Sequence, residues 1–180
     1  MKKIAALILN RNLPKITDQL YDEIKKNNKN LVDIFVIDAG SELKKRSKYT
    51  TWKADSKSIK KKGLRYGRGM NYGLLQLWKE KKFENYDAFL LLTNDTEFPN
   101  SKFVSKLMNI LKKHKKIGIL SPCSKNWGEK IFLKKEKTKY FWFIHNTCYL
   151  LRKEFVKDVI NTKNPNYLNF LFDGSNFRGY

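Results

Sequence analysis

The sequence predicts an α/β protein with a mostly parallel central sheet flanked by helices, and with a mixed or antiparallel portion toward its C-terminus. Three largely apolar runs, at 4–9, 31–37 and 88–92, are typical of strands that are buried on both faces. Segments with apolar residues at helical spacing alternate with these runs, and such alternation favours parallel pairing through crossover helices. The chain has 180 residues, which is enough for one domain with a sizeable core.

The first part of the chain is expected to form two strands, one helix and a long loop. The strand at 4–9 leads into a helix that Thr17 caps and that runs to about Asn27. The strand at 31–37 follows. Residues 41–63 are polar, basic and without periodicity, so they predict a long loop of the kind that is usually functional or mobile.

The second part begins with a glycine-punctuated turn at 67–73 that opens a helix. The next expected elements are a strand at 88–92, a helix that Pro99 and Asn100 open and that carries an apolar stripe at 103–111, strands at 117–120, 130–133 and 140–151, and a short helix at 153–160. The strand-rich end predicts the mixed or antiparallel portion of the sheet.

The charge of the chain indicates anionic partners. The formal net charge is +21, and many lysines occur in runs such as Lys60 to Lys62. Such an excess favours nucleic acid, a phosphorylated substrate or an acidic membrane surface, although lysine runs are also common on solvated helix faces. An apolar content of 41% with 14% aromatic residues excludes a disordered chain.

The two cysteines and the apolar runs indicate a cytoplasmic protein. Cys123 and Cys148 lie in apolar surroundings without metal-ligand spacing, which predicts two buried, reduced thiols. The apolar run near the N-terminus is too short for a secretory signal and lacks a cleavage site after it. No run approaches the roughly 20 apolar residues of a spanning helix, so any membrane contact is expected to be peripheral.

Polar side chains follow three of the predicted strands. Asn10 and Asn12 follow the first strand, Asp38 ends the second, and Asp95 follows the strand at 88–92. In an open α/β sheet these ends converge on one crevice, where ligands bind. Carboxylates there suit Mg²⁺ or Mn²⁺ bound jointly with substrate phosphates, whereas the alternative for either aspartate is a turn or helix cap.

Six stretches, in matching order and spacing, resemble motifs of the family-two glycosyltransferases with the Rossmann-like GT-A fold, in particular of rhamnosyltransferase-like members. They are FVIDAGSE, GLRYGRGMNYGLLQL, LLLTNDTEFP, GILSP, NTCYLLRKEF and FDGSNFRGY. The third corresponds to the family's DxD segment, and the last leads toward its acidic ED motif. The resemblance covers nearly the whole chain.

The resemblance implies that a nucleoside diphosphate sugar binds at the strand ends with Mn²⁺ or Mg²⁺. Asp95 matches the last aspartate of the DxD segment and would hold the metal, with Glu97 as a weaker second ligand. Thr93 stands where the family has its first acidic residue. The implied nucleotide-sugar-binding residues are Asn10, Asn12, Asp38, Arg68, Asn71, Asn94 and Asp95.

The implied activity is metal-dependent transfer of the sugar to a hydroxyl acceptor, with inversion, in the assembly of cell-surface polysaccharide or glycolipid. The family's catalytic base would follow Tyr180, so the chain is expected to be truncated before it; Asp173 is the nearest carboxylate in the matching segment. Residues 1–122 would form the nucleotide-sugar-binding half of one domain, and 123–180 an incomplete acceptor-side half. A glycan or lipid-linked acceptor, together with the lysines, favours the cytoplasmic face of the plasma membrane.

Two alternatives stay open at this point. Lysines interleaved with Trp52, Tyr66 and Tyr72 suit a phosphate backbone with stacked bases, although no nucleic-acid-binding signature accompanies them. The other alternative keeps the fold but lacks transfer: a module that binds the donor without turning it over.

Overall fold

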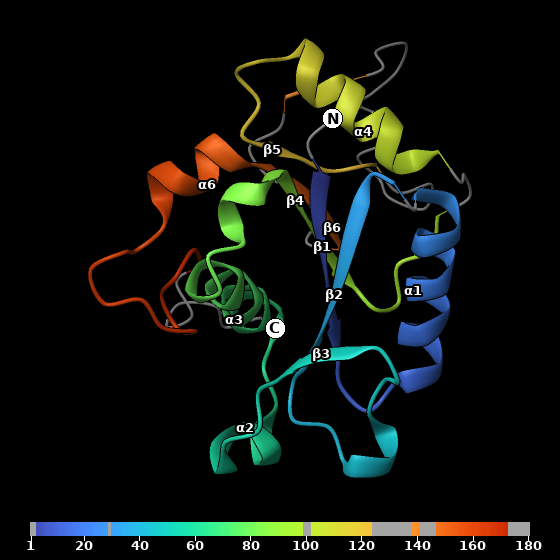
Figure 1. Ribbon diagram of the computed structural model, residues 1–180, viewed down its shortest axis with the longest axis vertical. Coiled ribbons are helices and arrows are strands. Elements are labelled where there is room, and N and C mark those ends of the chain that lie inside the picture. The colour runs from blue at the N-terminus through green and yellow to red at the C-terminus, as the bar shows by residue number, and fades with distance from the viewer. Residues whose placement is uncertain (1–2, 29, 99–101, 124–137, 141–146, 173–180) are drawn as a thin grey trace.

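The computed structural model describes residues 3–28, 30–98, 102–123, 138–140 and 147–172. Its centre is a six-stranded sheet with the strand order β3-β2-β1-β4-β6-β5 (Figure 1). The first four strands along the chain run parallel, β6 pairs antiparallel with β4, and β5 pairs antiparallel with β6. The predicted parallel sheet with an antiparallel C-terminal portion is therefore confirmed. The strands are β1 (Lys3–Asn10), β2 (Val32–Asp38), β3 (Thr50–Lys53), β4 (Tyr86–Thr93), β5 (Ile119–Leu120) and β6 (Cys148–Arg152).

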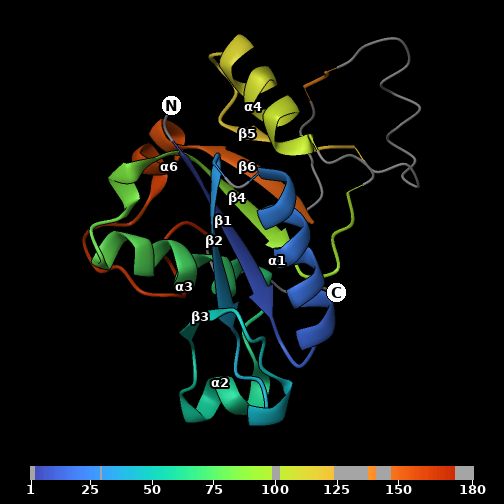
Figure 2. The same cartoon turned by 45° about the vertical axis from the view of Figure 1, so that its right-hand side comes forward.

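Helices cover both faces of this sheet (Figure 2). Residues of α1 and α4 pack on one face, and residues of α3 and α6 pack on the other. Short α2 lies with β3 at the end of the molecule opposite α4 (Figures 1 and 2). The helices are α1 (Pro14–Asn28), α2 (Lys57–Lys62), α3 (Tyr66–Lys79), α4 (Phe103–Lys113) and α6 (Lys153–Val159), with 3-10 turns η1 (Leu43–Lys45) and η2 (Phe83–Asn85).

The central strands are apolar at successive positions because both of their faces are covered. In β1, Ile4, Ala6 and Ile8 pack toward α1 and α4, whereas Ala5 and Leu7 pack toward α3. Side chains alternate between the faces of a strand, so a strand between two helical layers needs apolar residues at every position. Strand β4 is apolar for the same reason, since its residues 88–92 are fully buried.

The prediction of a long loop over residues 41–63 is wrong, because this segment contains η1, β3 and α2. Strand β3 pairs with β2 at the edge of the sheet, and Trp52 is its single buried residue. The Trp52 ring stacks on Phe35 with a centroid distance of 4.9 Å. A four-residue strand with one buried residue shows no alternation of apolar and polar residues, so its sequence pattern does not differ from that of a loop.

Two other boundaries differ from the prediction. Helix α1 begins at Pro14, where a proline costs no hydrogen bond, and Thr17 is a buried residue inside its first turn rather than its cap. The strand predicted at 117–120 is shortened to β5. The strand predicted at 130–133, most of 140–147 and the helix-opening residues Pro99 and Asn100 lie outside the described residues.

Gly40 lets α2 pack against the end of β2. Its φ is +83°, a backbone conformation that residues with a side chain rarely adopt. A Cβ at this position would lie 2.5 Å from the carbonyl oxygen of Ile59, in the middle of α2. Only glycine therefore permits this close approach.

The cysteines differ in exposure, which corrects the expectation of two buried thiols: Cys148 is buried in β6, whereas Cys123 is exposed. Burial raises the pKa of the Cys148 thiol to about 12. Because the thiolate is the reactive form, we expect Cys148 to resist alkylation at pH 8 until the protein unfolds, while Cys123 reacts in the native state. Counting thiols labelled by iodoacetamide before and after adding urea measures this; native labelling of both cysteines would contradict it.

Across the described parts of the chain, no helix combines the length and apolar character needed to cross a bilayer.

Candidate functional site

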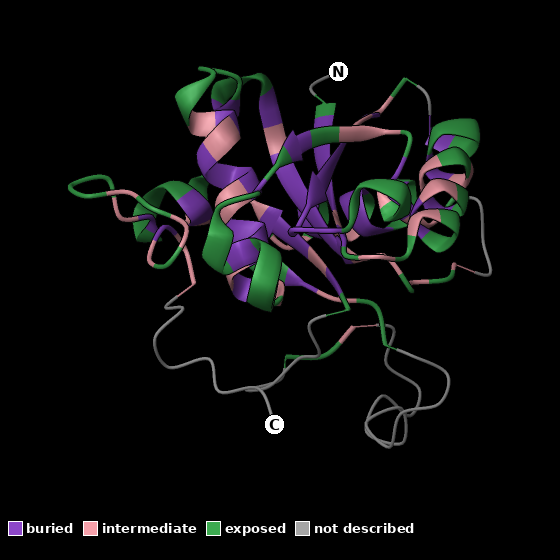
Figure 3. Cartoon of the chain, turned by 90° about the horizontal axis from the view of Figure 1, so that it is seen from below, coloured by how far each residue is buried: buried purple, intermediate pink, exposed green. Residues whose placement is uncertain are grey.

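The carboxyl ends of the parallel strands meet at one edge of the sheet. Asn10 at the end of β1 lies in register with Asp38 at the end of β2, and Leu9 lies in register with Thr93 at the end of β4. The residues that follow each strand therefore leave the sheet side by side, as predicted. Figure 3 views the molecule from this end.

Asn10 is the centre of a polar network at this edge. Its side chain is buried; Oδ1 accepts hydrogen bonds from the Leu13 N–H at 3.3 Å and the Thr17 hydroxyl at 2.9 Å, and Nδ2 donates to Ser41 Oγ at 3.4 Å. Asn94, just after β4, donates from Nδ2 to Thr17 Oγ1 at 3.1 Å. The structure thus brings Asn10 and Asn94 together through Thr17, for which the sequence pattern predicts only a helix cap.

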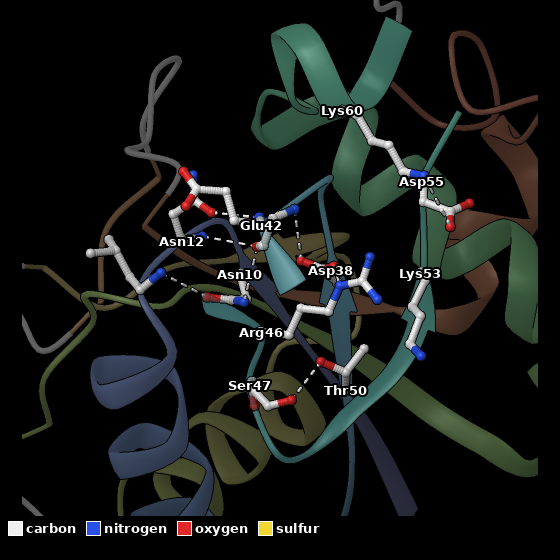
Figure 4. A network of polar contacts seen from close by, with 12 residues as sticks. Asn10, Asn12, Asp38, Glu42, Arg46, Ser47, Thr50, Lys53, Asp55 and Lys60 are labelled. Carbon is white, nitrogen blue, oxygen red and sulfur yellow. Dashed lines mark hydrogen bonds and ion pairs between the residues drawn. The ribbon is translucent and has the colours of Figure 1, made fainter. Parts of the chain in front are cut away.

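Asn12 joins the loop after β1 to the loop after β2. Its φ of +59° is in the left-handed region, which asparagine tolerates better than most residues. Its N–H donates to Ser41 Oγ at 2.9 Å, and its Oδ1 accepts from the Glu42 N–H at 2.9 Å (Figure 4). Both loops are therefore held in one arrangement.

Asp38 is fully buried and forms an ion pair that the sequence pattern does not predict. Its Oδ1 accepts the Ser41 N–H at 3.2 Å, and its Oδ2 lies 3.1 Å from Arg46 Nε (Figure 4). The Arg46 side chain is 19% exposed, so it covers the Asp38 carboxylate at the surface of the site. An uncompensated charge would be costly here, and the Arg46 guanidinium supplies the compensation. The sequence signal for Arg46 was only its place in a basic run.

Asp95 occupies a tight turn directly after β4. The turn is closed by the Thr96 N–H, which donates to the Thr93 carbonyl at 3.3 Å, and by a 3.0 Å contact between the Thr93 and Thr96 hydroxyls. Asp95 and Glu97 are both exposed. Within the described part of the chain, the Asp95 carboxylate makes no hydrogen bond or ion pair, so its oxygens face solvent and are available to a ligand.

Asn71 is placed differently from the other predicted site residues. Its buried side chain holds the chain that follows α6: Nδ2 donates to the carbonyls of Tyr167 at 3.2 Å and Phe172 at 2.7 Å, while Oδ1 accepts the N–H groups of Leu171 at 2.9 Å and Phe172 at 2.8 Å. Both amide hydrogens are used, so Asn71 is a positioning residue in this structure. Arg68 lies half-buried in the first turn of α3.

The residues present fit a metal that is shared with a ligand rather than one enclosed by protein. Among the described residues, no three histidine, cysteine, aspartate or glutamate side chains gather in a way that could hold a metal. Mg²⁺ and similar ions commonly use one or two carboxylates together with substrate phosphates. The solvent-facing carboxylate of Asp95 meets that requirement. Asp173, the weak candidate for the base, lies outside the described residues.

The aromatic residues that would stack nucleic-acid bases are engaged within the fold. Trp52 stacks on Phe35 and donates from Nε1 to Glu80 at 2.7 Å, and the Tyr72 hydroxyl donates to the Lys53 carbonyl at 2.9 Å. The Tyr66 hydroxyl is buried and has no hydrogen-bond partner within the described ranges, and burial raises the pKa of Tyr66. These contacts leave no aromatic platform for bases among the three side chains.

No family model and no curated protein matches this chain. Solved structures do match. The mannosyltransferase PcManGT from Pyrobaculum calidifontis, in complex with GDP-Man and Mn²⁺, is similar with a TM-score of 0.61 and 9% identity, covering 87% of this chain and 46% of its own. Glucosyl-3-phosphoglycerate synthase from Mycobacterium tuberculosis, in complex with Mn²⁺, UDP-Glc and phosphoglyceric acid, is similar with a TM-score of 0.57 and 17% identity, covering 92% and 61%.

Mannosyl-3-phosphoglycerate synthase from Rubrobacter xylanophilus is also similar, with a TM-score of 0.52 and 15% identity over 88% of this chain and 56% of its own. The chain thus spans roughly half to three-fifths of the length of these neighbours. Identities this low bear on the fold alone. Together with the sheet order and the helices on both faces, they show that the chain has the GT-A fold found in nucleotide-sugar-dependent glycosyltransferases.

Proposed function

We propose that this chain binds a nucleoside diphosphate sugar together with Mn²⁺ or Mg²⁺, and that the protein transfers the sugar to a hydroxyl acceptor. One observation carries the proposal. On a GT-A fold, the ends of β1, β2 and β4 are joined by hydrogen bonds through Asn10, Thr17, Ser41 and Asn94, and Asp95 follows directly with an exposed carboxylate that makes no hydrogen bond or ion pair to any described residue. Ligands of open α/β sheets bind at this edge.

The end of β2 is the proposed place of the nucleotide base. Asp38 and Arg46 form a buried pair there, with Asn12 and Ser41 beside them. Arg46 covers the Asp38 carboxylate, so a nucleotide base can contact Asp38 only after the Arg46 side chain moves. If Arg46 stays in place, the nucleotide base contacts the guanidinium instead. Both groups discriminate bases by hydrogen bonding, since a carboxylate accepts and a guanidinium donates.

The turn after β4 is the proposed place of the diphosphate. Asp95 would hold the metal, Glu97 is a weaker second ligand, and Arg68 and Asn94 would lie along the donor. A bound divalent cation neutralises the negative charge that develops on the diphosphate when it leaves. Asn71 contributes indirectly, because it holds residues 167–172 against α3.

The transfer itself breaks the bond between the anomeric carbon and the phosphate oxygen, and the electron pair leaves with the diphosphate. The acceptor oxygen forms the new bond to that carbon and gives its proton to a general base. We infer inversion and a base beyond Tyr180 from the family resemblance. The acceptor is proposed to be a glycan or a lipid-linked acceptor in cell-surface polysaccharide or glycolipid assembly, at the inner face of the plasma membrane.

Calorimetric titration of the chain with UDP and GDP sugars tests the donor site. We expect at least one nucleotide sugar to bind, and to bind more tightly with Mn²⁺ present than with EDTA, because Asp95 would hold the metal and the metal would offset the charge of the diphosphate. Hydrolysis or transfer of the bound sugar then separates a transferase from a module that only binds. If no nucleotide sugar binds, with or without metal, the proposed function is wrong.

A further inference from the structure

We propose that the surface around η1 and the start of α1 docks on an anionic lipid bilayer, next to the candidate donor site. This docking surface consists of Leu13, Lys15, Ile16, Leu43, Lys44, Lys57, Lys61 and Lys62. The inference deepens the membrane location included in the proposed function, because it assigns that contact to particular residues.

Three aliphatic side chains of the docking surface are exposed. Leu43 is 78% exposed at the first position of η1, and Leu13 and Ile16, at the start of α1, are 47% and 40% exposed. The hydrogen bond from the Glu42 N–H to Asn12 Oδ1 holds the chain just before Leu43 against the chain just before Leu13. Leu13 and Leu43, far apart in sequence, thus each directly follow one of the two residues that this hydrogen bond joins.

The segment between β2 and α3 is strongly basic. Residues 42–65 contain ten basic and two acidic residues, a net charge of +8 in 24 residues. The ion pairs of this segment join Lys45 to Glu42, Arg46 to Asp38, Lys48 to Asp22 and Lys60 to Asp55. Five exposed lysines of the segment form no ion pair with any residue that the structure describes: Lys44, Lys53, Lys57, Lys61 and Lys62. Their charge is therefore available to an external anion.

The arrangement of α2 keeps its lysines on the outside. Ile59 is buried against Gly40, and the Arg11 guanidinium donates to the Lys62 carbonyl at 2.7 Å, satisfying the end of the helix. The side chains of Lys57, Lys61 and Lys62 are exposed around this anchored turn. Figures 1 and 2 place α2 at one end of the molecule, away from α4.

An anionic bilayer fits this combination better than a nucleic acid does. Lysines attract acidic headgroups, and exposed leucines beside them enter the boundary between headgroups and acyl chains. A nucleic acid would call for stacking aromatic side chains, but Trp52 is buried and stacked on Phe35, and Tyr72 is half-buried with its hydroxyl bonded to the Lys53 carbonyl. The docking surface adjoins Asn12 and Glu42 of the strand-end network, so a docked protein would hold its donor site beside the headgroups.

Vesicle sedimentation of the chain tests the proposal. We expect binding to vesicles of phosphatidylglycerol mixed with phosphatidylcholine, and none to phosphatidylcholine alone. Changing Lys44, Lys57, Lys61 and Lys62 to Gln should weaken the partition roughly a hundredfold or more, because each lysine near an anionic leaflet contributes. The matched control changes Lys112, Lys113, Lys115 and Lys116 to Gln near the end of α4, and should weaken it far less.

A second pair of variants tests the apolar contribution. Leu13→Ser with Leu43→Ser should weaken the partition about tenfold, whereas Val159→Ser with Leu168→Ser, also exposed, should not. Equal recovery on both vesicle types or an equal effect of the α4 control would each overturn the proposal. Nucleotide-sugar titration of the same variants without vesicles reports on the donor site separately, and we expect it to be unchanged.

Discussion

Replacing Asp95 by asparagine is expected to abolish the metal-dependent part of nucleotide-sugar binding. The carboxylate is exposed and makes no contact with the described residues, so the substitution removes a charge without disturbing the turn at Thr93 to Thr96. Losing a charge-assisted contact costs about 1.5–3 kcal/mol, which corresponds to a roughly 10- to 100-fold weaker affinity. Calorimetry of Asp95→Asn with and without Mn²⁺ measures the effect, and the unfolding midpoint should be unchanged.

Asp158→Asn is the matched control for this experiment. Asp158 is also an exposed aspartate without a partner in the described structure, but it lies on α6, away from the strand ends. It should bind donor and metal as the wild-type chain does. Glu97→Gln should have a smaller effect than Asp95→Asn. If Asp95→Asn keeps the full metal dependence, Asp95 is not the metal ligand, whatever the chain binds.

Replacing Asn71 by alanine is expected to lower the free energy of unfolding by about 3 kcal/mol or more. The change removes four hydrogen bonds to residues 167–172 and leaves their backbone groups without partners, and each buried unsatisfied group costs about 1–3 kcal/mol. For a chain of this size the midpoint of thermal unfolding should fall by roughly 6–12 °C. Urea unfolding monitored by tryptophan fluorescence gives the free energy directly.

Two further variants show whether the Asn71 amide acts as inferred. Asn85→Ala removes the same atoms from an exposed side chain and should change stability by less than about 0.5 kcal/mol. Asn71→Asp keeps the acceptor but directs a carboxylate at the carbonyls of Tyr167 and Phe172, so it should be about as harmful as alanine. Unchanged stability with weakened donor binding would instead make Asn71 a ligand-binding residue.

The central strands and their polar ends could be predicted because each is visible over a few consecutive residues. A strand covered on both faces requires an apolar run, and β1 and β4 show such runs without interruption. The polar residues that end these runs, Asn10, Asp38 and Asn94 to Asp95, follow at the positions where the strands leave the sheet. The alternation of strands with helices then implied that these ends lie at one edge.

The edge strand and the charge pairing could not be predicted in the same way. Strand β3 buries only Trp52, and its place in the sheet depends on β2 and on the contact between Trp52 and Phe35. Arg46 is one of several basic residues in its run, and nothing local distinguishes it from Lys44 or Lys45. Its contact with Asp38 exists because η1 returns the chain to the end of β2.

The α/β class, the central strands and the edge of the sheet at which the polar residues gather can all be derived from the order of the amino acids. These features follow from hydrophobic burial, because each buried strand requires apolar residues at consecutive positions of the sequence. The folded chain was needed to show that Arg46 covers Asp38, that Asn71 holds residues 167–172 and that Asn12 bonds to Glu42. Each of these depends on hydrogen bonds or ion pairs between distant segments, which the folded chain alone brings within reach.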